Sequence, residues 1–131
     1  MFAHLPRVSL ATLPTPITEA RGLRAALGGD TRCPRILIKR DDLTGLGLGG
    51  NKARKLEFLV GDALAQGATC LVTTGAVQSN HARMTAAAAR VAGLEVVLVL
   101  TTTTPTPEIQ GNFLLDHLYG AEVELIPAGP D

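Results

Sequence analysis

The chain has 131 residues, 46% of them hydrophobic and 18% charged, which is the composition of a single folded domain rather than of a disordered chain. Its 12 basic and 12 acidic side chains leave no net charge, so neither nucleic acid nor an anionic membrane is expected as a partner. The sequence lacks a signal-peptide pattern, an apolar run of roughly 18 residues and a metal-ligand spacing around its cysteines, so we expect a cytoplasmic protein without a metal site.

The first 20 residues are expected to form an irregular arm, because Pro6, Pro14 and Pro16 interrupt backbone hydrogen bonding. Beyond this arm, segments of helical periodicity alternate with short β-rich runs. The elements predicted in chain order are helix 19–27, strand 35–39, glycine-rich loop 44–52, helix 52–66, strand 69–74, turn 75–79, helix 80–92, strand 95–101, helix 108–119 and strand 122–126.

This alternation of strands with single helices predicts an α/β fold, an open parallel twisted sheet with helices on both faces. The clearest strand, residues 95–101 (EVVLVLT), is almost continuously aliphatic, as expected of a strand covered on both sides. In such sheets ligands bind beyond the carboxyl ends of the strands, in the strand-to-helix loops. Two loops of this kind are unusual in this sequence.

The first unusual loop, residues 44–52 (TGLGLGGNK), stands directly before a predicted helix that Asn51 is expected to cap and Gly67 to end. Glycine permits positive φ angles and close approach of a ligand, and the free N–H groups of a helix start favour anions. Lys52 at this position would hold its amine near a phosphorylated ligand and lose its proton readily, as a Schiff-base lysine requires.

Other interpretations of this loop stay open on the residues alone. Gly45, Gly47 and Gly50 match the dinucleotide pattern G-x-G-x-x-G, but residues 39–42 (KRDD) separate the pattern from its strand, and the next strand ends in TTG instead of an acidic residue. The phosphate-binding Walker pattern fails because an asparagine separates the glycine from the lysine and an alanine follows it. A flexible connection before a solvent-facing lysine is the remaining interpretation.

The second unusual loop, residues 75–81 (GAVQSNH), presents amide, hydroxyl and imidazole groups at the start of a predicted helix. Several donors together with a helix N-terminus suit a carboxylate or another anion. The alternative is structural: Ser79 or Asn80 caps the helix, and His81 is a surface histidine.

The motifs GGNKARKLEF, residues 49–58, and GAVQSNHARMTAA, residues 75–87, resemble those of the family of D-cysteine desulfhydrases and 1-aminocyclopropane-1-carboxylate deaminases. This resemblance covers nearly the whole chain and includes the arm LPTPI, residues 13–17. It implies a pyridoxal-phosphate-dependent enzyme with the fold of the tryptophan synthase β subunit. Within that fold, residues 1–50 are expected to be an arm and first strand of the cofactor domain, and residues 51–131 a small α/β domain.

The resemblance also implies roles for individual residues. Lys52 matches the lysine that holds pyridoxal phosphate and later moves protons at the substrate α carbon. Asn80 matches the asparagine that hydrogen-bonds the 3′ oxygen of the cofactor, Lys55 is similar to a lysine that reaches the phosphate, and Asn51 flanks the cofactor lysine. The residues that match the substrate carboxylate loop are Gln78, Ser79, Asn80 and His81.

The implied reaction is an elimination on a small amino-acid substrate. The substrate amine displaces Lys52, the α proton is removed, and the cofactor ring takes up the negative charge. From D-cysteine, sulfide leaves, and pyruvate and ammonia remain. His81 after the QSN triplet is more similar to the desulfhydrase branch, while 1-aminocyclopropane-1-carboxylate deaminase and cysteate lyase of the same family remain alternatives.

Family members are considerably longer than this chain, so the resemblance implies an N-terminal fragment of an enzyme expected to be a homodimer. The later phosphate loop, the group that faces the pyridine nitrogen and a catalytic tyrosine have no match in these residues. Half of a cofactor site should bind weakly, so we expect little or no desulfhydrase activity from this chain alone. The rival hypotheses are a non-catalytic α/β fragment that binds an anion or a partner and, less favoured, a nucleotide-binding domain.

Overall fold

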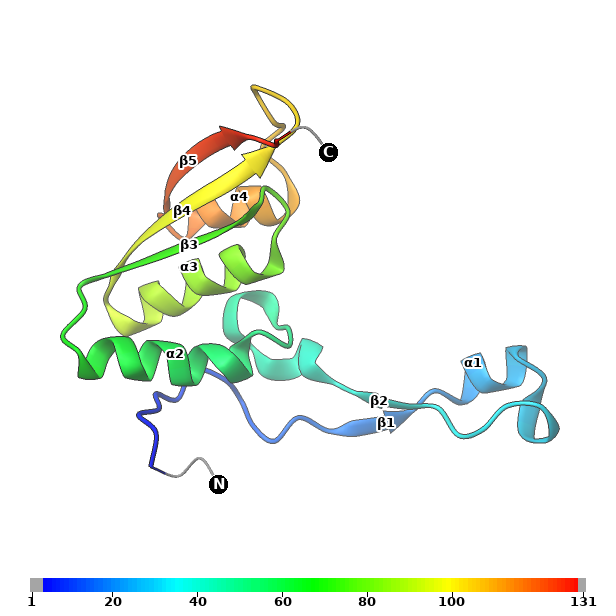
Figure 1. Ribbon diagram of the computed structural model, residues 1–131. Helices are drawn as coiled ribbons and strands as arrows, with labels where there is room; N and C mark the ends of the chain where they lie inside the picture. Colours follow the sequence, from blue (N-terminus) through cyan, green and yellow to red (C-terminus); the bar gives the residue numbers. More distant parts are fainter. Residues whose placement is uncertain (1–3, 130–131) are drawn as a thin grey trace.

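A computed structural model describes residues 4–129 of the protein, and its centre is a three-stranded parallel sheet (Figure 1). The strands β3 (Cys70–Ala76), β4 (Glu95–Thr102) and β5 (Glu122–Pro127) lie in this order across the sheet. The helices α3 (Asn80–Ala92) and α4 (Gly111–Leu118) connect them and cover one face of the sheet. The predicted α/β fold with a parallel sheet is therefore confirmed.

The core lies between this sheet face and α3. Along β4, Val96, Leu98 and Leu100 point to the helices and are buried, while the residues between them are half-buried, as the two-residue period of a strand requires. Residues 82–89 of α3 are all buried, and five of these eight are alanine. Such small side chains allow neighbouring backbones to approach α3 closely, and α2 (Ala53–Ala65) and α4 both pack against it.

A second sheet, formed by β1 (Ile17–Glu19) and β2 (Leu37–Lys39), extends away from this core with α1 (Arg21–Ala26) at its far end (Figure 1). The two strands are antiparallel, and Ile17 lies opposite Lys39. The prediction of an irregular arm over the first 20 residues was wrong here. The prolines precede β1, and the carbonyl of Pro16 accepts a hydrogen bond from Arg40, so they do not interrupt the ladder.

Several predicted boundaries also differ from the structure. The helix α2 begins at Ala53, and Asn51 does not cap it. The strand β3 continues through Gly75 and Ala76, which were predicted as part of a turn. The helix α4 begins three residues later than predicted, at Gly111. The limits of α3 match the prediction, since Ser79 caps it through a hydrogen bond from the backbone N–H of Ala82.

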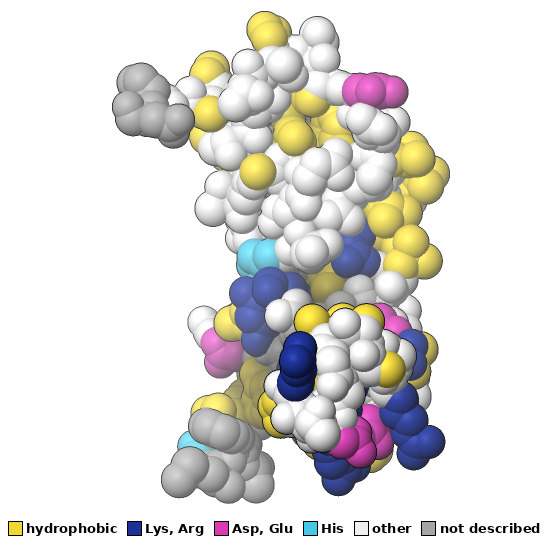
Figure 2. Space-filling model, turned by 90° about the vertical axis from the view of Figure 1, so that its right-hand side faces the viewer, with side chains coloured by type: hydrophobic (Ala, Val, Ile, Leu, Met, Phe, Trp, Pro, Cys, Tyr) yellow, Lys and Arg dark blue, Asp and Glu magenta, His cyan; other side chains and the backbone are white. Residues whose placement is uncertain are grey.

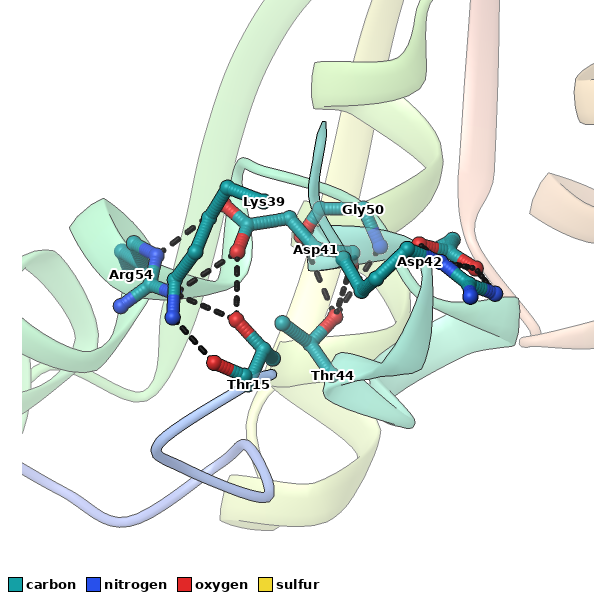
Figure 3. A network of polar contacts seen from close by, with 8 residues as sticks. Thr15, Lys39, Asp41, Asp42, Thr44, Gly50 and Arg54 are labelled. Carbon is teal, nitrogen blue, oxygen red and sulfur yellow. Dashed lines mark hydrogen bonds and ion pairs between the residues drawn. The ribbon is translucent and has the colours of Figure 1, made fainter. Parts of the chain in front are cut away.

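A network of polar contacts joins the end of β2 to the start of α2 (Figure 3). Asp41 Oδ2 accepts a hydrogen bond of 3.0 Å from Arg54 Nε, and Asp41 Oδ1 accepts bonds from Arg54 Nη2 at 2.7 Å and Thr15 Oγ1 at 2.9 Å. The pKa of Asp41 is lowered to about 2, mainly by its hydrogen bonds from Arg54. The carbonyl of Asp41 accepts a 2.8 Å bond from Gly50 N, so the same residue holds the glycine loop.

The N-terminal arm is held on α2 by the buried carboxylate of Glu57, which is 1% exposed. Its Oε1 accepts hydrogen bonds of 3.1 Å from the backbone N–H groups of Leu10 and Ala11, and its Oε2 accepts a 2.8 Å bond from Arg7 Nε. Burial raises the pKa of Glu57, but these donors outweigh it and hold the pKa below its ordinary value.

In residues 4–129, no helix is long and apolar enough to cross a membrane.

Enlarging a buried alanine of α3 should destabilise the fold. Ala88 is fully buried, so Ala88→Leu overpacks the core around α3 and should lower the free energy of unfolding by about 1–3 kcal/mol. Val91 on the same helix is 65% exposed, and Val91→Leu should change it by less than about 0.5 kcal/mol. Urea unfolding of both variants measures the difference, and equal effects would contradict this account of the core.

The contact between Asp41 and Arg54 should make stability depend on acid pH. Because the pKa of Asp41 is lowered from 3.8 to about 2 in the folded state, its stabilisation is fully present above pH 3.8 and is lost as the pH falls towards 2. Asp41→Asn should therefore be less stable than the unchanged protein at neutral pH and lose less stability over this acid range. Urea unfolding at several pH values tests this, and parallel pH profiles would contradict it.

Candidate functional site

The glycine-rich loop before α2 is folded tightly against the end of β2. Gly49 has a φ of +81°, and a Cβ atom on it would lie 2.0 Å from the carbonyl oxygen of Asp42. Only glycine fits this close approach. The adjoining Gly50 is hydrogen-bonded through its N–H to the Asp41 carbonyl and to Thr44 Oγ1, at 2.8 and 3.0 Å. The loop is a fixed support that brings Asn51 and Lys52 to the start of α2.

Three of the residues singled out from the sequence come together beside α3. Lys52 directly precedes α2, and its Nζ donates a 3.2 Å hydrogen bond to Asn51 Oδ1. Lys52 and Lys55 lie close enough to His81 for their positive charges to lower the pKa of its imidazole, after the larger effect of burial. Figure 2 shows a histidine beside a group of basic side chains at the middle of the molecule. Positive charge at a helix N-terminus is an arrangement that suits an anionic ligand.

The loop between β3 and α3 supplies further donors for an anion. A Cβ atom on Gly75 would lie 2.7 Å from Ser79 Cβ and Oγ, so the loop closes over a position that only glycine can occupy. Ser79 Oγ caps α3 by accepting a 3.2 Å hydrogen bond from the backbone N–H of Ala82, the third residue of the helix. Within residues 4–129, the backbone N–H groups of Asn80 and His81 take part in no hydrogen bond, and they remain available to a ligand at the helix N-terminus.

His81 is held by a threonine on each side of its ring. Its Nε2 lies 3.2 Å from Thr73 Oγ1, and its Nδ1 lies 3.4 Å from Thr85 Oγ1. The hydroxyl of Thr85 donates to the backbone carbonyl of His81 at 2.8 Å, so toward Nδ1 it can only accept. This favours the tautomer with the proton on Nδ1, and the lowered pKa keeps the ring neutral near pH 7.

The side chain of Gln78 is engaged by the start of α4. Its Oε1 accepts a 2.9 Å hydrogen bond from the backbone N–H of Asn112, and its Nε2 donates to the carbonyl of Gln110 at 3.1 Å. Gly111 makes this approach possible, because a Cβ atom on it would lie 2.6 Å from Gln78 Oε1. Gln78 thus holds the loop on α4, and its contact with substrate stays a prediction.

Two residues that the sequence analysis did not single out contact the site. Arg83 Nη2 and Asn112 Nδ2 both donate to Asn80 Oδ1, at 3.3 and 2.9 Å. Arg83 stands inside a recognised motif, so its place there was a signal of a role. Asn112 comes from α4, 32 residues after Asn80, and only the fold brings it to the site.

These groups suit the phosphate of pyridoxal phosphate. The Lys52 amine lies at the end of the glycine loop, and the backbone N–H groups of Asn80 and His81 at the start of α3 take part in no hydrogen bond within residues 4–129. In addition, no hydrogen bond within the described part of the chain uses the side-chain Nδ2 of Asn80, which leaves it available to an acceptor oxygen. No group of three potential metal ligands occurs within residues 4–129.

Comparisons with known proteins agree with this chemistry. The family described as pyridoxal-phosphate dependent enzymes matches residues 8–131. A D-cysteine desulfhydrase of Serratia proteamaculans is 47% identical over 131 residues, covering 97% of this chain and 38% of that protein. A Pyrococcus horikoshii protein, provisionally named a 1-aminocyclopropane-1-carboxylate deaminase, is 47% identical over 128 residues, covering 98% of this chain and 37% of that protein.

The fold agrees as well. A crystal structure of a homologue of 1-aminocyclopropane-1-carboxylate deaminase is similar with a TM-score of 0.86 and 46% identity, covering 98% of this chain and 37% of that one. The chain thus spans well under half the length of the relatives it matches. The family match also decides against the dinucleotide and Walker interpretations of the glycine loop. Since the match runs from residue 8 to residue 131, this chain belongs to the family of pyridoxal-phosphate dependent enzymes, as its two motifs predicted.

Proposed function

We propose that this chain carries the cofactor lysine and the substrate carboxylate loop of a pyridoxal-phosphate-dependent lyase, with Lys52 as the cofactor lysine and D-cysteine as the substrate. The products are sulfide, pyruvate and ammonia. The packing of the loop that carries Lys52 against α3 is the observation that carries this proposal: Arg83 Nη2 donates to the Gly49 carbonyl at 3.2 Å, and a Cβ atom on Gly50 would lie 2.9 Å from Met84 Sδ. Lys52 is thereby brought to the helix whose first backbone N–H groups take part in no hydrogen bond within residues 4–129.

The residues of the chain divide the work of binding. Lys52 Nζ holds the cofactor, and Lys55 contributes positive charge towards its phosphate. Asn80 donates a hydrogen bond to the ring oxygen. The free N–H groups at the start of α3 and the hydroxyl of Ser79 receive the substrate carboxylate. Pyridoxal phosphate supplies an electron sink for the charge that develops at the substrate α carbon.

Lys52 also moves the proton. When its amine is not bound to the cofactor, Lys52 Nζ would be able to accept the proton from the substrate α carbon. Asn51 Oδ1 accepts a hydrogen bond from this amine at 3.2 Å and so keeps it near the loop. Burial and the charges of Lys55 and Lys52 lower the pKa of His81, so its imidazole would meet the ligand as a neutral group.

Ring opening of 1-aminocyclopropane-1-carboxylate is the alternative within the family, since relatives with both names are 47% identical to this chain. Cysteate lyase is a further alternative. The QSNH sequence at residues 78–81 supports the desulfhydrase branch. An α/β fragment that binds an anion or a partner without covalent chemistry is the candidate from another class.

Reductive trapping should place pyridoxal phosphate on Lys52. The chain contains only three lysines, Lys39, Lys52 and Lys55, so the labelled peptide identifies the site directly. After incubation with the cofactor and reduction with borohydride, mass spectrometry should find most of the label on Lys52. Lys52→Met should lower total labelling by about tenfold, because only the Lys52 amine stands at the end of the glycine loop and contacts Asn51. Lys39→Met is the matched control and should leave the label in place.

Equal labelling of all three lysines would contradict the proposed site and favour the non-catalytic fragment.

Substrate preference should follow the desulfhydrase branch in a complete enzyme. A chimera would carry residues 1–131 of this chain in place of the matching segment of the Serratia proteamaculans desulfhydrase. We expect kcat/KM for sulfide release from D-cysteine to exceed that for ammonia release from 1-aminocyclopropane-1-carboxylate by about tenfold or more. The 131-residue chain alone should give only background rates. Preferential turnover of the cyclopropane substrate would reverse the assignment, and fast sulfide release by the chain alone would contradict the expected dependence on further residues.

A further inference from the structure

The side-chain oxygen of Asn80 is occupied by two donors, and its nitrogen by none. Asn112 Nδ2 donates to Asn80 Oδ1 at 2.9 Å, and Arg83 Nη2 donates to the same atom at 3.3 Å. No hydrogen bond within the described residues uses Asn80 Nδ2. The side chain is exposed, so this nitrogen faces a ligand or solvent.

The chemistry of the two donors fixes which end of the amide they contact. A guanidinium has donors only and cannot accept from an amide N–H. Asn112 Nδ2 also donates 2.7 Å to the backbone carbonyl of Gln78, a group that can only accept, so the Asn112 amide cannot be turned round either. Both neighbours therefore require the oxygen of Asn80. The N–H pair of Asn80 is left to point outward.

Arg83 is itself held firmly in place. Its side chain is 6% exposed, and Nη2 donates to the carbonyl of Gly49 at 3.2 Å. Asp116, which is fully buried on α4, lies near enough for an electrostatic attraction to the guanidinium. Arg83 thus joins the glycine loop to the first turn of α3 by hydrogen bonds, and it lies near Asp116 of α4.

We propose that Arg83 and Asn112 are positioning residues that orient the amide of Asn80 so that its N–H donors, and not its oxygen, face the bound ligand. The inference rests on the proposed function for the identity of that ligand, which must present an acceptor oxygen such as the ring oxygen of pyridoxal phosphate. With the amide reversed, two oxygens would face each other, and binding would weaken.

The orientation itself can be tested in the cofactor-free chain by side-chain amide NMR. The side-chain NH2 protons of Asn112 donate to two protein acceptors and should exchange slowly with water. Those of Asn80 should exchange about tenfold faster or more, because they have no protein acceptor. Slow exchange at Asn80, or equal rates at the two residues, would overturn the proposal whatever the chain binds.

Variants test the consequence for binding. Asn112→Leu and Arg83→Met remove one donor each and should weaken pyridoxal phosphate binding, measured by the label on Lys52 at increasing cofactor concentration, by about tenfold. The pH midpoint of the visible absorbance change of the bound cofactor should also shift. Arg83→Lys retains a donor and should recover part of both effects.

The control variant is Val96→Ala, which removes buried methyl groups at the amino end of β4, away from the loops. It should lower the melting temperature and leave binding and the absorbance midpoint unchanged. If Val96→Ala shifts them as Asn112→Leu does, the effect is one of stability and the proposal fails. If the unchanged chain takes no label on Lys52, the proposed function fails, while the NMR measurement still decides the orientation of Asn80.

Discussion

The burial of α3 is the constraint on which the rest of the structure depends. A Cβ atom on Gly47 would lie 2.7 Å from Ala87 Cβ, and one on Gly50 would lie 2.9 Å from Met84 Sδ. The glycine loop therefore rests directly on α3, and two of its glycines are needed for this contact. Because α3 also follows β3, the same helix brings the loop that carries Lys52 and the β3–α3 loop together. The small side chains of α3 thus allow both the dense packing of the core and the close approach of the two loops.

Two buried polar residues, Arg83 on α3 and Asp116 on α4, are arranged for position more than for stability. Arg83 Nε and Nη1 and both carboxyl oxygens of Asp116 are buried without hydrogen-bond partners among the described residues. Burial raises the pKa of Asp116 to about 7, although the charge of Arg83 acts to lower it. An apolar pair would pack more stably than such partners. The contact of Arg83 with Asn80 fits a requirement for a fixed donor geometry at this position.

Much of the fold follows from local sequence signals, and the exceptions have physical reasons. The limits of α3 were predictable because Ser79 and Gly93 are strong local cap signals. The strand β1 was not predicted, because the prolines that argue against regular structure stand directly before it and not within it. Asn51 was expected to cap α2, but its side chain instead accepts from Lys52. The preference of asparagine for helix starts does not show that a neighbouring lysine can donate to the same side-chain oxygen.

The site divides in the same way. Lys52 and residues 78–81 stand in motifs and were predicted as site residues from the sequence, whereas Asn112 follows a glycine at a helix start that carries no motif. Its role arises only when the β3–α3 loop and the start of α4 are adjacent, which Gly111 permits by its positive φ of +57° and its lack of a Cβ atom. The loop cannot move without breaking the hydrogen bonds that join Gln78 and Asn80 to α4. The orientation of the Gln78 and Asn80 side chains is therefore fixed by α4, a helix outside the two sequence motifs.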